Sequence, residues 1–248
     1  MRKDLGRFNR GELILGFIWW GMFLAGTTIL IEIAFLLCGV RGELLFTDPG
    51  TYAAFNLAVS LFNFFAVLLI FRRFLAEQFI RLRVRGFRTV VDLILGVALA
   101  FVAILVAAYL SDFVKYVFHV KEEVNPNQEA VESIVTAKPW MGILLVCICA
   151  PVTEELLNRG LIFNPLCKVN RVLAYVVSML VFSGIHVIGS IADVPIGVSL
   201  ANLIIYCAPG FALCWIYDRS RTIWSPIFLH MIYNGFMLLL QTLPQVAD

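Results

Sequence analysis

The sequence predicts an all-α protein, a polytopic bundle of about seven transmembrane helices, with eight as the alternative count. Of its 248 residues 61% are hydrophobic and only 15% are charged, and the mean hydropathy is +0.90. A typical soluble domain is about 45–50% apolar and about 25% charged, and a globule of this size could not hide the excess apolar surface from water. The net charge of +2 is too small to indicate a nucleic-acid partner, so the expected environment is a lipid bilayer.

Each predicted span is a run of mostly apolar residues close to the length of about 20 that crosses the hydrocarbon core as a helix. The first run follows a basic tail, but it is too long for a signal-peptide core and no A-x-A cleavage site follows it, so we expect a retained anchor. The seven runs are 13–38, 52–71, 90–110, 140–167, 172–188, 196–217 and 224–243.

The connections between these runs alternate between basic and non-basic. Lysine and arginine gather in the N-terminal tail, in 72–88, at 168–171 and at 219–221, whereas the other connections are mixed or acidic. The positive-inside rule places basic connections in the cytoplasm. We therefore predict a cytoplasmic N-terminus and an outer C-terminus. The compact size and short tails favour the plasma membrane of a bacterium.

Two connections are longer than a turn. The stretch 72–88 interleaves arginines with large apolar residues, which is typical either of an amphipathic helix on anionic lipid or of a solvated cytoplasmic loop. The stretch 111–139 is polar and is expected to be an extracytoplasmic loop with a short helix. The six cysteines lie in or beside apolar runs without CxxC spacing, so they are interpreted as small buried hydrophobic residues and not as a disulfide frame.

The fourth run contains charged residues that should be costly at membrane depth, at about 2.5–3.5 kcal/mol each. Glu155 and Arg159 are four residues apart, in the order that favours an ion pair on one helix face. Glu154 projects about 100° away from Glu155 and has no obvious partner, which makes it a functional candidate. Pro151, one turn upstream, can free a backbone carbonyl and bend the helix.

Two later spans carry a histidine each. Phe182 and His186 share a helix face in the fifth span, and His230 and Asn234 share one in the seventh. Counting about 1.5 Å per residue from the 168–171 turn places Glu154 and His186 at matching depth. We therefore predict that these polar groups converge on one cavity that opens toward the cytoplasm. The third histidine, in the 111–139 connection, is interpreted as incidental.

The residue types in this cluster suit hydrolysis. A carboxylate in an apolar wall is suited to act as a general base, and a neighbouring histidine could polarise the same water. An imidazole N–H and an asparagine amide could stabilise an oxyanion. The sequence has neither a Gx[ST]xG element nor an HExxH motif. Glu154, His186 and His230 could also bind zinc as two histidines and one carboxylate, so a zinc site stays open as an alternative.

Three elements together resemble the type II CAAX prenyl endopeptidase family, also called the CPBP or Abi family. Its pattern is EExxxR, then FxxxH, then HxxxN or HxxxD, on separate membrane helices, and all of these positions are matched by the three segments 154–159, 182–186 and 230–234. The resemblance implies a catalytic core over 140–243. Residues 1–139 form transmembrane helices and loops without a recognised motif.

The resemblance also implies residue roles. Glu154 would activate water and His186 would share that water, while His230 and Asn234 would form the oxyanion site. Glu155, Arg159 and Phe182 would hold the geometry. The implied activity is an intramembrane endopeptidase acting on a membrane protein or peptide, as a glutamate protease without a cofactor, with a zinc enzyme as the alternative.

Other functions fit the same fold. A non-catalytic scaffold, an immunity factor or a chaperone of membrane proteins would retain these helices without turnover. A transporter, or a haem protein using His186 and His230, is a further alternative. Cleavage assays separate the first group from an enzyme, and a Soret band would identify haem.

Overall fold

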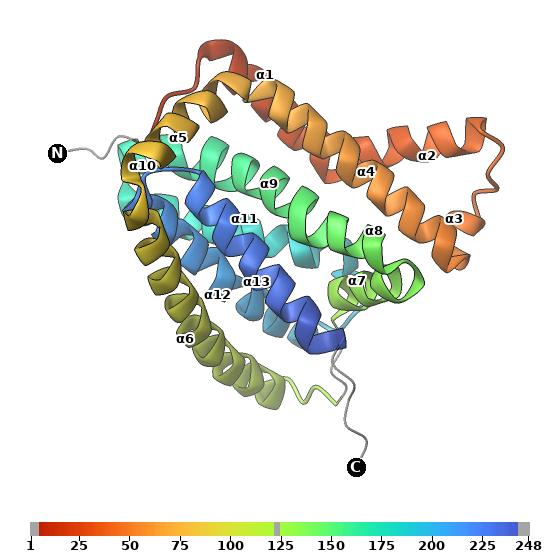
Figure 1. Ribbon diagram of the computed structural model, residues 1–248. Coiled ribbons are helices and arrows are strands. Elements are labelled where there is room, and N and C mark those ends of the chain that lie inside the picture. Colours follow the sequence, from red (N-terminus) through yellow and green to blue (C-terminus); the bar gives the residue numbers. More distant parts are fainter. Residues whose placement is uncertain (1–4, 122–124, 243–248) are drawn as a thin grey trace.

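The computed structural model describes residues 5–121 and 125–242, and within these ranges every regular element is a helix. Figure 1 shows the arrangement along the chain. The α-helices of the first half are α1 (Arg10–Gly21), α2 (Thr27–Leu37), α3 (Leu44–Thr47), α4 (Pro49–Ile70), α5 (Arg72–Arg85) and α6 (Phe87–Val117). Those of the second half are α7 (Pro126–Ala137), α8 (Pro139–Leu144), α9 (Ala150–Glu155), α10 (Asn164–Val169), α11 (Arg171–Val187), α12 (Ile196–Ser220) and α13 (Trp224–Thr242).

Three π-helical segments and one 3-10 turn join these helices. Met22–Gly26 connects α1 to α2, Leu145–Cys149 connects α8 to α9, and Leu156–Phe163 connects α9 to α10. The 3-10 turn Ile188–Ser190 follows α11. π-turns add a residue to the helical repeat and often lie at functional sites. The two π-helical segments of the fourth span therefore make it a candidate location of a functional site.

The predicted polytopic helical bundle is confirmed. Six helical stretches of the described chain are long and apolar enough to cross a membrane, and the helix at Trp224–Leu240 is a shorter apolar one. These six are Arg10–Leu37, Pro49–Ile70, Phe87–Val117, Pro139–Val169, Arg171–Ser190 and Ile196–Ser220. The orientation of the bundle stays a prediction.

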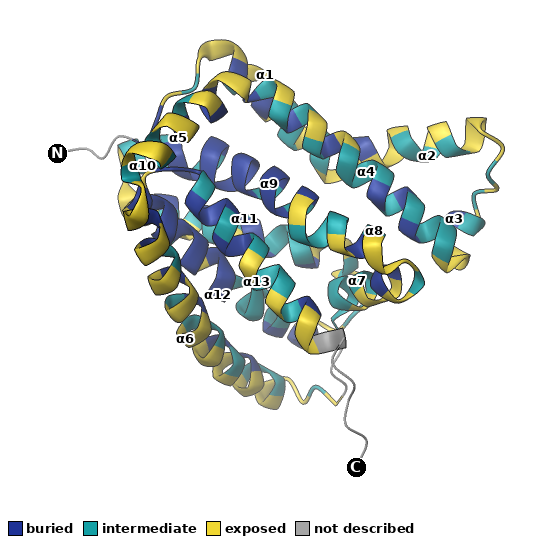
Figure 2. Ribbon diagram, viewed as in Figure 1, coloured by how far each residue is buried: buried dark blue, intermediate teal, exposed yellow. Residues whose placement is uncertain are grey.

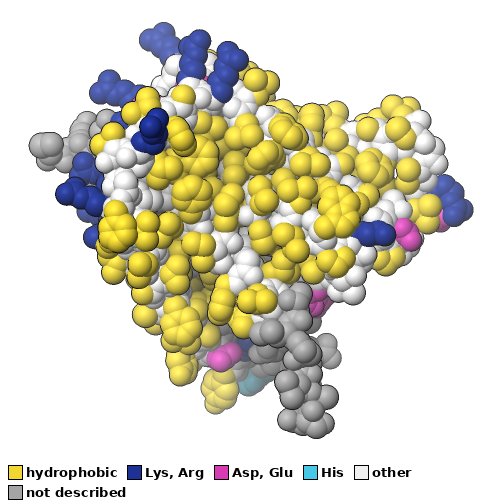
Figure 3. All heavy atoms as spheres, viewed as in Figure 1, with side chains coloured by type: hydrophobic (Ala, Val, Ile, Leu, Met, Phe, Trp, Pro, Cys, Tyr) yellow, Lys and Arg dark blue, Asp and Glu magenta, His cyan; other side chains and the backbone are white. Residues whose placement is uncertain are grey.

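The surface of the protein is largely apolar, as contact with lipid requires. Large apolar side chains are exposed along every long helix, and Figure 3 shows them covering the visible face. Lysine and arginine gather at the end of the molecule where α5 and α10 lie. The apolar belt and the basic end together have the form of a membrane-spanning body with one charged interface.

Buried residues concentrate in the helices of the second half. The spans Pro139–Val169 and Ile196–Ser220 are the most buried of the six, Figure 2 shows α9 largely buried, and α12 packs against both α6 and α11. Small residues make this close packing possible: a Cβ on Gly210 of α12 would lie only 3.3 Å from the Phe182 ring of α11. The helices that carry the sequence motifs therefore form the packed centre of the protein.

Both long connections contain helices. The arginine-rich stretch forms α5, which confirms the helical alternative; Phe74 and Gln78 are buried, whereas Phe79 and Ile80 are exposed. The 111–139 connection contains the expected short helix, α7. The third span is longer than predicted, because α6 continues through the polar Ser111 to Val117. None of the six cysteines forms a disulfide; Cys149 and Cys214 are buried, but Cys38 is exposed, contrary to expectation.

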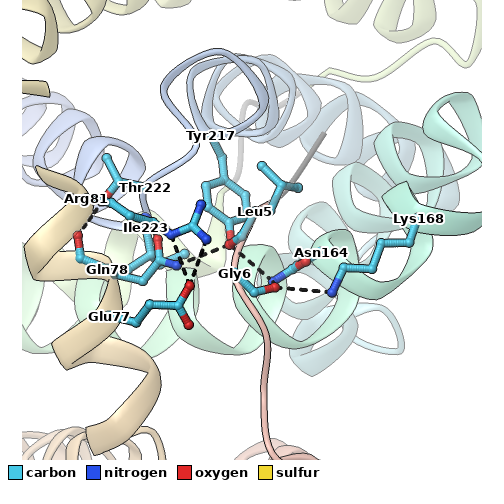
Figure 4. A network of polar contacts seen from close by, with 10 residues as sticks. All are labelled: Leu5, Gly6, Glu77, Gln78, Arg81, Asn164, Lys168, Tyr217, Thr222 and Ile223. Atoms are coloured by element: carbon cyan, nitrogen blue, oxygen red, sulfur yellow. Dashed lines mark hydrogen bonds and ion pairs between the residues drawn. The ribbon is translucent and has the colours of Figure 1, made fainter. Parts of the chain in front are cut away.

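Figure 4 shows a polar network that anchors the N-terminal segment at the basic end. The Leu5 carbonyl accepts from Gln78 Nε2 at 3.1 Å and from the Tyr217 hydroxyl at 3.1 Å, and Lys168 Nζ donates to the Gly6 carbonyl at 3.1 Å. Gly6 has φ +95°, and a Cβ there would lie 2.3 Å from Gln78 Nε2. The network ties the start of the described chain to α5, α10 and α12.

Gln78 is the centre of this network, and Gln78→Leu is expected to destabilise the protein strongly. Its Oε1 also accepts from the Ile223 N–H at 3.0 Å, and the side chain is fully buried. Loss of the amide leaves the buried Ile223 N–H without its partner, at about 1–3 kcal/mol, and removes one of the donors to the Leu5 carbonyl. The thermal unfolding midpoint in detergent should fall, whereas Arg83→Leu, at an exposed position of α5, should change stability by under about 0.5 kcal/mol.

Candidate active site

The fourth span is one continuous helix with two π-helical segments, and Pro151 closely follows the first of them. In the π segment before α9 the Ala150 N–H donates to the Leu145 carbonyl, five residues back. The same register would pair the Val146 carbonyl with residue 151, which is proline and has no N–H. Asn234 of α13 donates its Nδ2 to that carbonyl at 2.8 Å. Pro151 thus frees a carbonyl, as the sequence predicts, and the freed group binds the seventh span.

The structure brings Glu154 of α9 and His186 of α11 together. Glu154 Oε2 lies 3.8 Å from His186 Nε2, and their side chains are 13% and 15% exposed. That distance is too long for a direct hydrogen bond, and the buried Oε2 has no hydrogen-bond partner among the described residues. His186 Nδ1 lies 2.8 Å from the Phe182 carbonyl. Because a carbonyl can only accept, Nδ1 carries the proton, and Nε2 presents its lone pair toward Glu154.

A second carboxylate, Glu155, lies in a buried ion cluster. Its Oε1 lies 3.0 Å from Arg159 Nη1 and 2.9 Å from His230 Nδ1, and both carboxylate and guanidinium are fully buried. Arg159 Nη2 also donates to the Gly210 carbonyl of α12 at 2.9 Å. The predicted Glu155–Arg159 ion pair is therefore present. It also fixes His230, whose Nδ1 is occupied by Glu155 so that only Nε2 is left for other partners.

Phe182 lies among these groups. The Arg159 guanidinium lies 4.5 Å from the centre of the Phe182 ring, and the rings of His186 and His230 lie 4.7 Å and 5.7 Å from it. Contact with the guanidinium is the arrangement expected of a cation–π pair, which gains strength when it is shielded from water. Phe182 therefore contacts the guanidinium and both imidazoles without adding a charge.

A cavity of about 340 Å³ lies over this cluster, and the four residues assigned to catalysis from the sequence all line it. Glu154, His186, His230 and Asn234 supply polar atoms, and the apolar part of the wall includes Val131 and Met237. His119 is not among the lining residues. Polar side chains that converge on a partly apolar cavity are the usual character of a small-molecule or peptide site.

The cavity wall affects the orientation predicted from the sequence. Asn125, Asn127 and Gln128, from the connection between α6 and α8, also line the cavity. The positive-inside rule placed that connection outside the cytoplasm, whereas the cavity was predicted to open toward the cytoplasm. These two predictions disagree in this fold, because the basic turns lie at the far end of the fourth span from α7.

Sequence reasoning missed one residue of the cavity that contacts a motif histidine. Tyr206 of α12 stacks on the His186 ring, with centroids 4.5 Å apart and planes at 26°. Its hydroxyl accepts from Asn127 Nδ2 at 3.0 Å and donates to Asn125 Oδ1 at 3.1 Å. The only signal in the sequence was the Asn-Pro-Asn segment, which indicates a turn and gives no partner.

The donor set does not fit the alternative zinc site. Among residues 5–121 and 125–242, no three His, Cys, Asp or Glu side chains are gathered closely enough to hold a metal ion. His230 Nδ1 contacts Glu155, which leaves Nε2 as its free nitrogen. The arrangement brings together one carboxylate and one imidazole, as a pair.

Comparison with known proteins identifies the same region. Residues 136–236 match the family model described as "Type II CAAX prenyl endopeptidase Rce1-like". The chain is 34% identical over 130 residues to the "Putative membrane peptidase YdiL" of Bacillus subtilis, covering 52% of this chain and 48% of that protein. It is 29% identical over 129 residues to the "Membrane-embedded CAAX protease MroQ" of Staphylococcus aureus, covering 49% and 47%.

A third relative is the "UPF0177 protein in abiGi 5'region" of Lactococcus lactis, 28% identical over 137 residues, covering 54% of each chain. The chain spans about half the length of the curated relatives it matches. No solved structure matches it. Residues 136–236 therefore resemble the Rce1-like type II CAAX prenyl endopeptidase family, and this confirms the resemblance predicted from the sequence.

Proposed function

We propose that this protein is an intramembrane endopeptidase that hydrolyses a peptide bond of a membrane-associated or lipidated protein through a water activated by Glu154 and His186. The observation that supports this proposal most directly is the closeness of Glu154 and His186. A carboxylate oxygen without a hydrogen-bond partner among the described residues and an imidazole nitrogen lie 3.8 Å apart beside one cavity, inside an apolar bundle. The match of the surrounding region to a protease family supports it.

The spacing of the pair suits a shared water. A water oxygen at about 2.8 Å from each group could donate one hydrogen to Glu154 Oε2 and the other to His186 Nε2, since both atoms accept. Glu154 takes a proton as the water oxygen bonds to the substrate carbonyl carbon. When the C–N bond breaks, the same proton passes to the leaving amine.

The oxyanion formed in the first step needs donors. His230 Nδ1 contacts Glu155, so Nε2 is the free nitrogen of the ring, and it can donate to the oxyanion when the ring carries both protons. Asn234 Nδ2 uses one hydrogen on the Val146 carbonyl and keeps a second for the oxyanion. Both residues line the cavity, on successive turns of α13.

Cleavage of a reporter in one membrane preparation tests the proposal. We expect the wild type to cleave, and Glu154→Ala and His186→Ala each to lose cleavage, with or without chelator. Equal cleavage by all three proteins would remove the catalytic assignment and leave a scaffold, immunity or chaperone function. Loss of wild-type cleavage on adding chelator alone would show that a metal takes part.

A further inference from the structure

His186 needs more than one contact to keep its orientation. The hydrogen bond from Nδ1 to the Phe182 carbonyl fixes one atom of the ring, and it lies within the same helical turn of α11. With that bond alone the imidazole could still pivot, which would move Nε2 relative to Glu154. The face of the ring is covered by Tyr206, whose centroid lies 4.5 Å away in a stacked arrangement. This second contact comes from α12, a different and deeply packed helix.

Tyr206 is itself fixed at its other end. The hydroxyl donates to Asn125 and accepts from Asn127, so its donor and an acceptor position are both used. Asn125 also caps α7 by accepting from the Gln128 N–H at 3.2 Å. The tyrosine therefore connects the imidazole to the start of α7, which forms part of the cavity wall.

We propose that Tyr206 is a positioning residue for His186. Its ring holds the imidazole plane so that Nε2 faces Glu154, and its hydroxyl ties that plane to α7 through Asn125 and Asn127. The catalytic consequence rests on the proposed function, but the contact does not. A misplacement of about 1 Å in an active site can cost about 100-fold in rate. We therefore expect loss of the Tyr206 ring to lower the rate more than loss of its hydroxyl.

Nuclear magnetic resonance tests the contact without an activity assay. The chain has three histidines, so ¹⁵N-histidine labelling of the full chain in detergent gives few signals, and His186→Gln assigns one. We expect His186 to be protonated at Nδ1 and its ring protons to be shifted upfield by Tyr206. Tyr206→Leu should move these signals downfield, Tyr206→Phe should retain them, and His119 should stay unchanged. A His186 signal that is the same in the wild type and in Tyr206→Leu would overturn the stack.

Kinetics test the positioning role. Tyr206→Leu should lower kcat by about 10- to 100-fold, with a much smaller change in KM. Tyr206→Phe, which keeps the ring, should have a kcat close to that of the wild type. Asn127→Ala removes one of the two hydrogen bonds that Tyr206→Phe removes, so the double variant should lose no more than Tyr206→Phe alone. Tyr109→Leu, at an exposed tyrosine of α6, should retain wild-type activity.

The outcomes separate this inference from the proposed function. An active wild type and an inactive Glu154→Gln, with kcat unchanged in a folded Tyr206→Leu, would overturn the Tyr206 role alone. A wild type that cleaves no reporter under conditions where it is folded would overturn the proposed function, and the catalytic role of Tyr206 with it. If Tyr206→Leu fails to fold, Tyr206→Phe, Asn127→Ala and their double variant test the role of Tyr206 instead. Losses of kcat that add up in the double variant contradict a shared hydrogen bond.

Discussion

Glu154→Gln is expected to lower the rate of cleavage by about 10²- to 10⁴-fold, the usual contribution of a general base. The amide has nearly the same shape as the carboxylate, but it cannot take a proton from water. Glu154 Oε2 makes no hydrogen bond within the described residues, so no native bond is lost. Removing a carboxylate from an apolar wall should leave stability unchanged or slightly raised. The measurement is kcat for the reporter beside the thermal unfolding midpoint of both proteins in the same detergent.

The adjacent carboxylate provides the matched control. Glu155→Gln makes the same chemical change one residue away, but at a side chain that binds Arg159 and His230. It should lower the unfolding midpoint, whereas Glu154→Gln should not. If Glu154→Gln lowered stability and left the rate within about twofold, Glu154 would be a packing residue and the water-activating role would be wrong.

The parts of this protein that the sequence predicts correctly depend on regular periodicity. Apolar runs of span length predicted the transmembrane helices, and spacing by four predicted the Glu155–Arg159 pair. Counting at a constant rise from one turn placed Glu154 and His186 at equal depth, and they lie 3.8 Å apart. Each of these arguments uses only positions within one helix or within a helical hairpin.

Contacts between distant helices could not be predicted in the same way. His230 contacts Glu155 across 75 residues, Asn234 contacts Val146 across 88, and Tyr206 contacts Asn125 across 81. The helical period predicts on which face of its helix a residue lies, but not which other helix that face contacts. The two π segments of the fourth span also change the repeat there, so faces counted at 3.6 residues per turn do not carry through Leu156–Phe163.

Arg159→Met is expected to destabilise the protein by about 3–5 kcal/mol, the cost of removing one partner from a buried ion pair. The guanidinium is fully buried, pairs with Glu155 and donates to the Gly210 carbonyl. Methionine fills similar space but leaves the Glu155 charge with His230 alone. The unfolding midpoint should fall by on the order of 10 °C. Arg41→Met is the control, because the Arg41–Glu43 pair is exposed and should be worth under about 1 kcal/mol.

The double variant Glu155→Leu/Arg159→Met separates stability from function. Removing both charges leaves no unpaired ion, and buried ion pairs replaced by apolar residues are often as stable as the original or more so. Stability should therefore return most of the way to that of the wild type. Cleavage should be lost in the double variant, because His230 Nδ1 then has no carboxylate to hold the ring in place. A stable double variant that cleaves at the wild-type rate would show that the cluster only packs the bundle, and that His230 needs no partner to act.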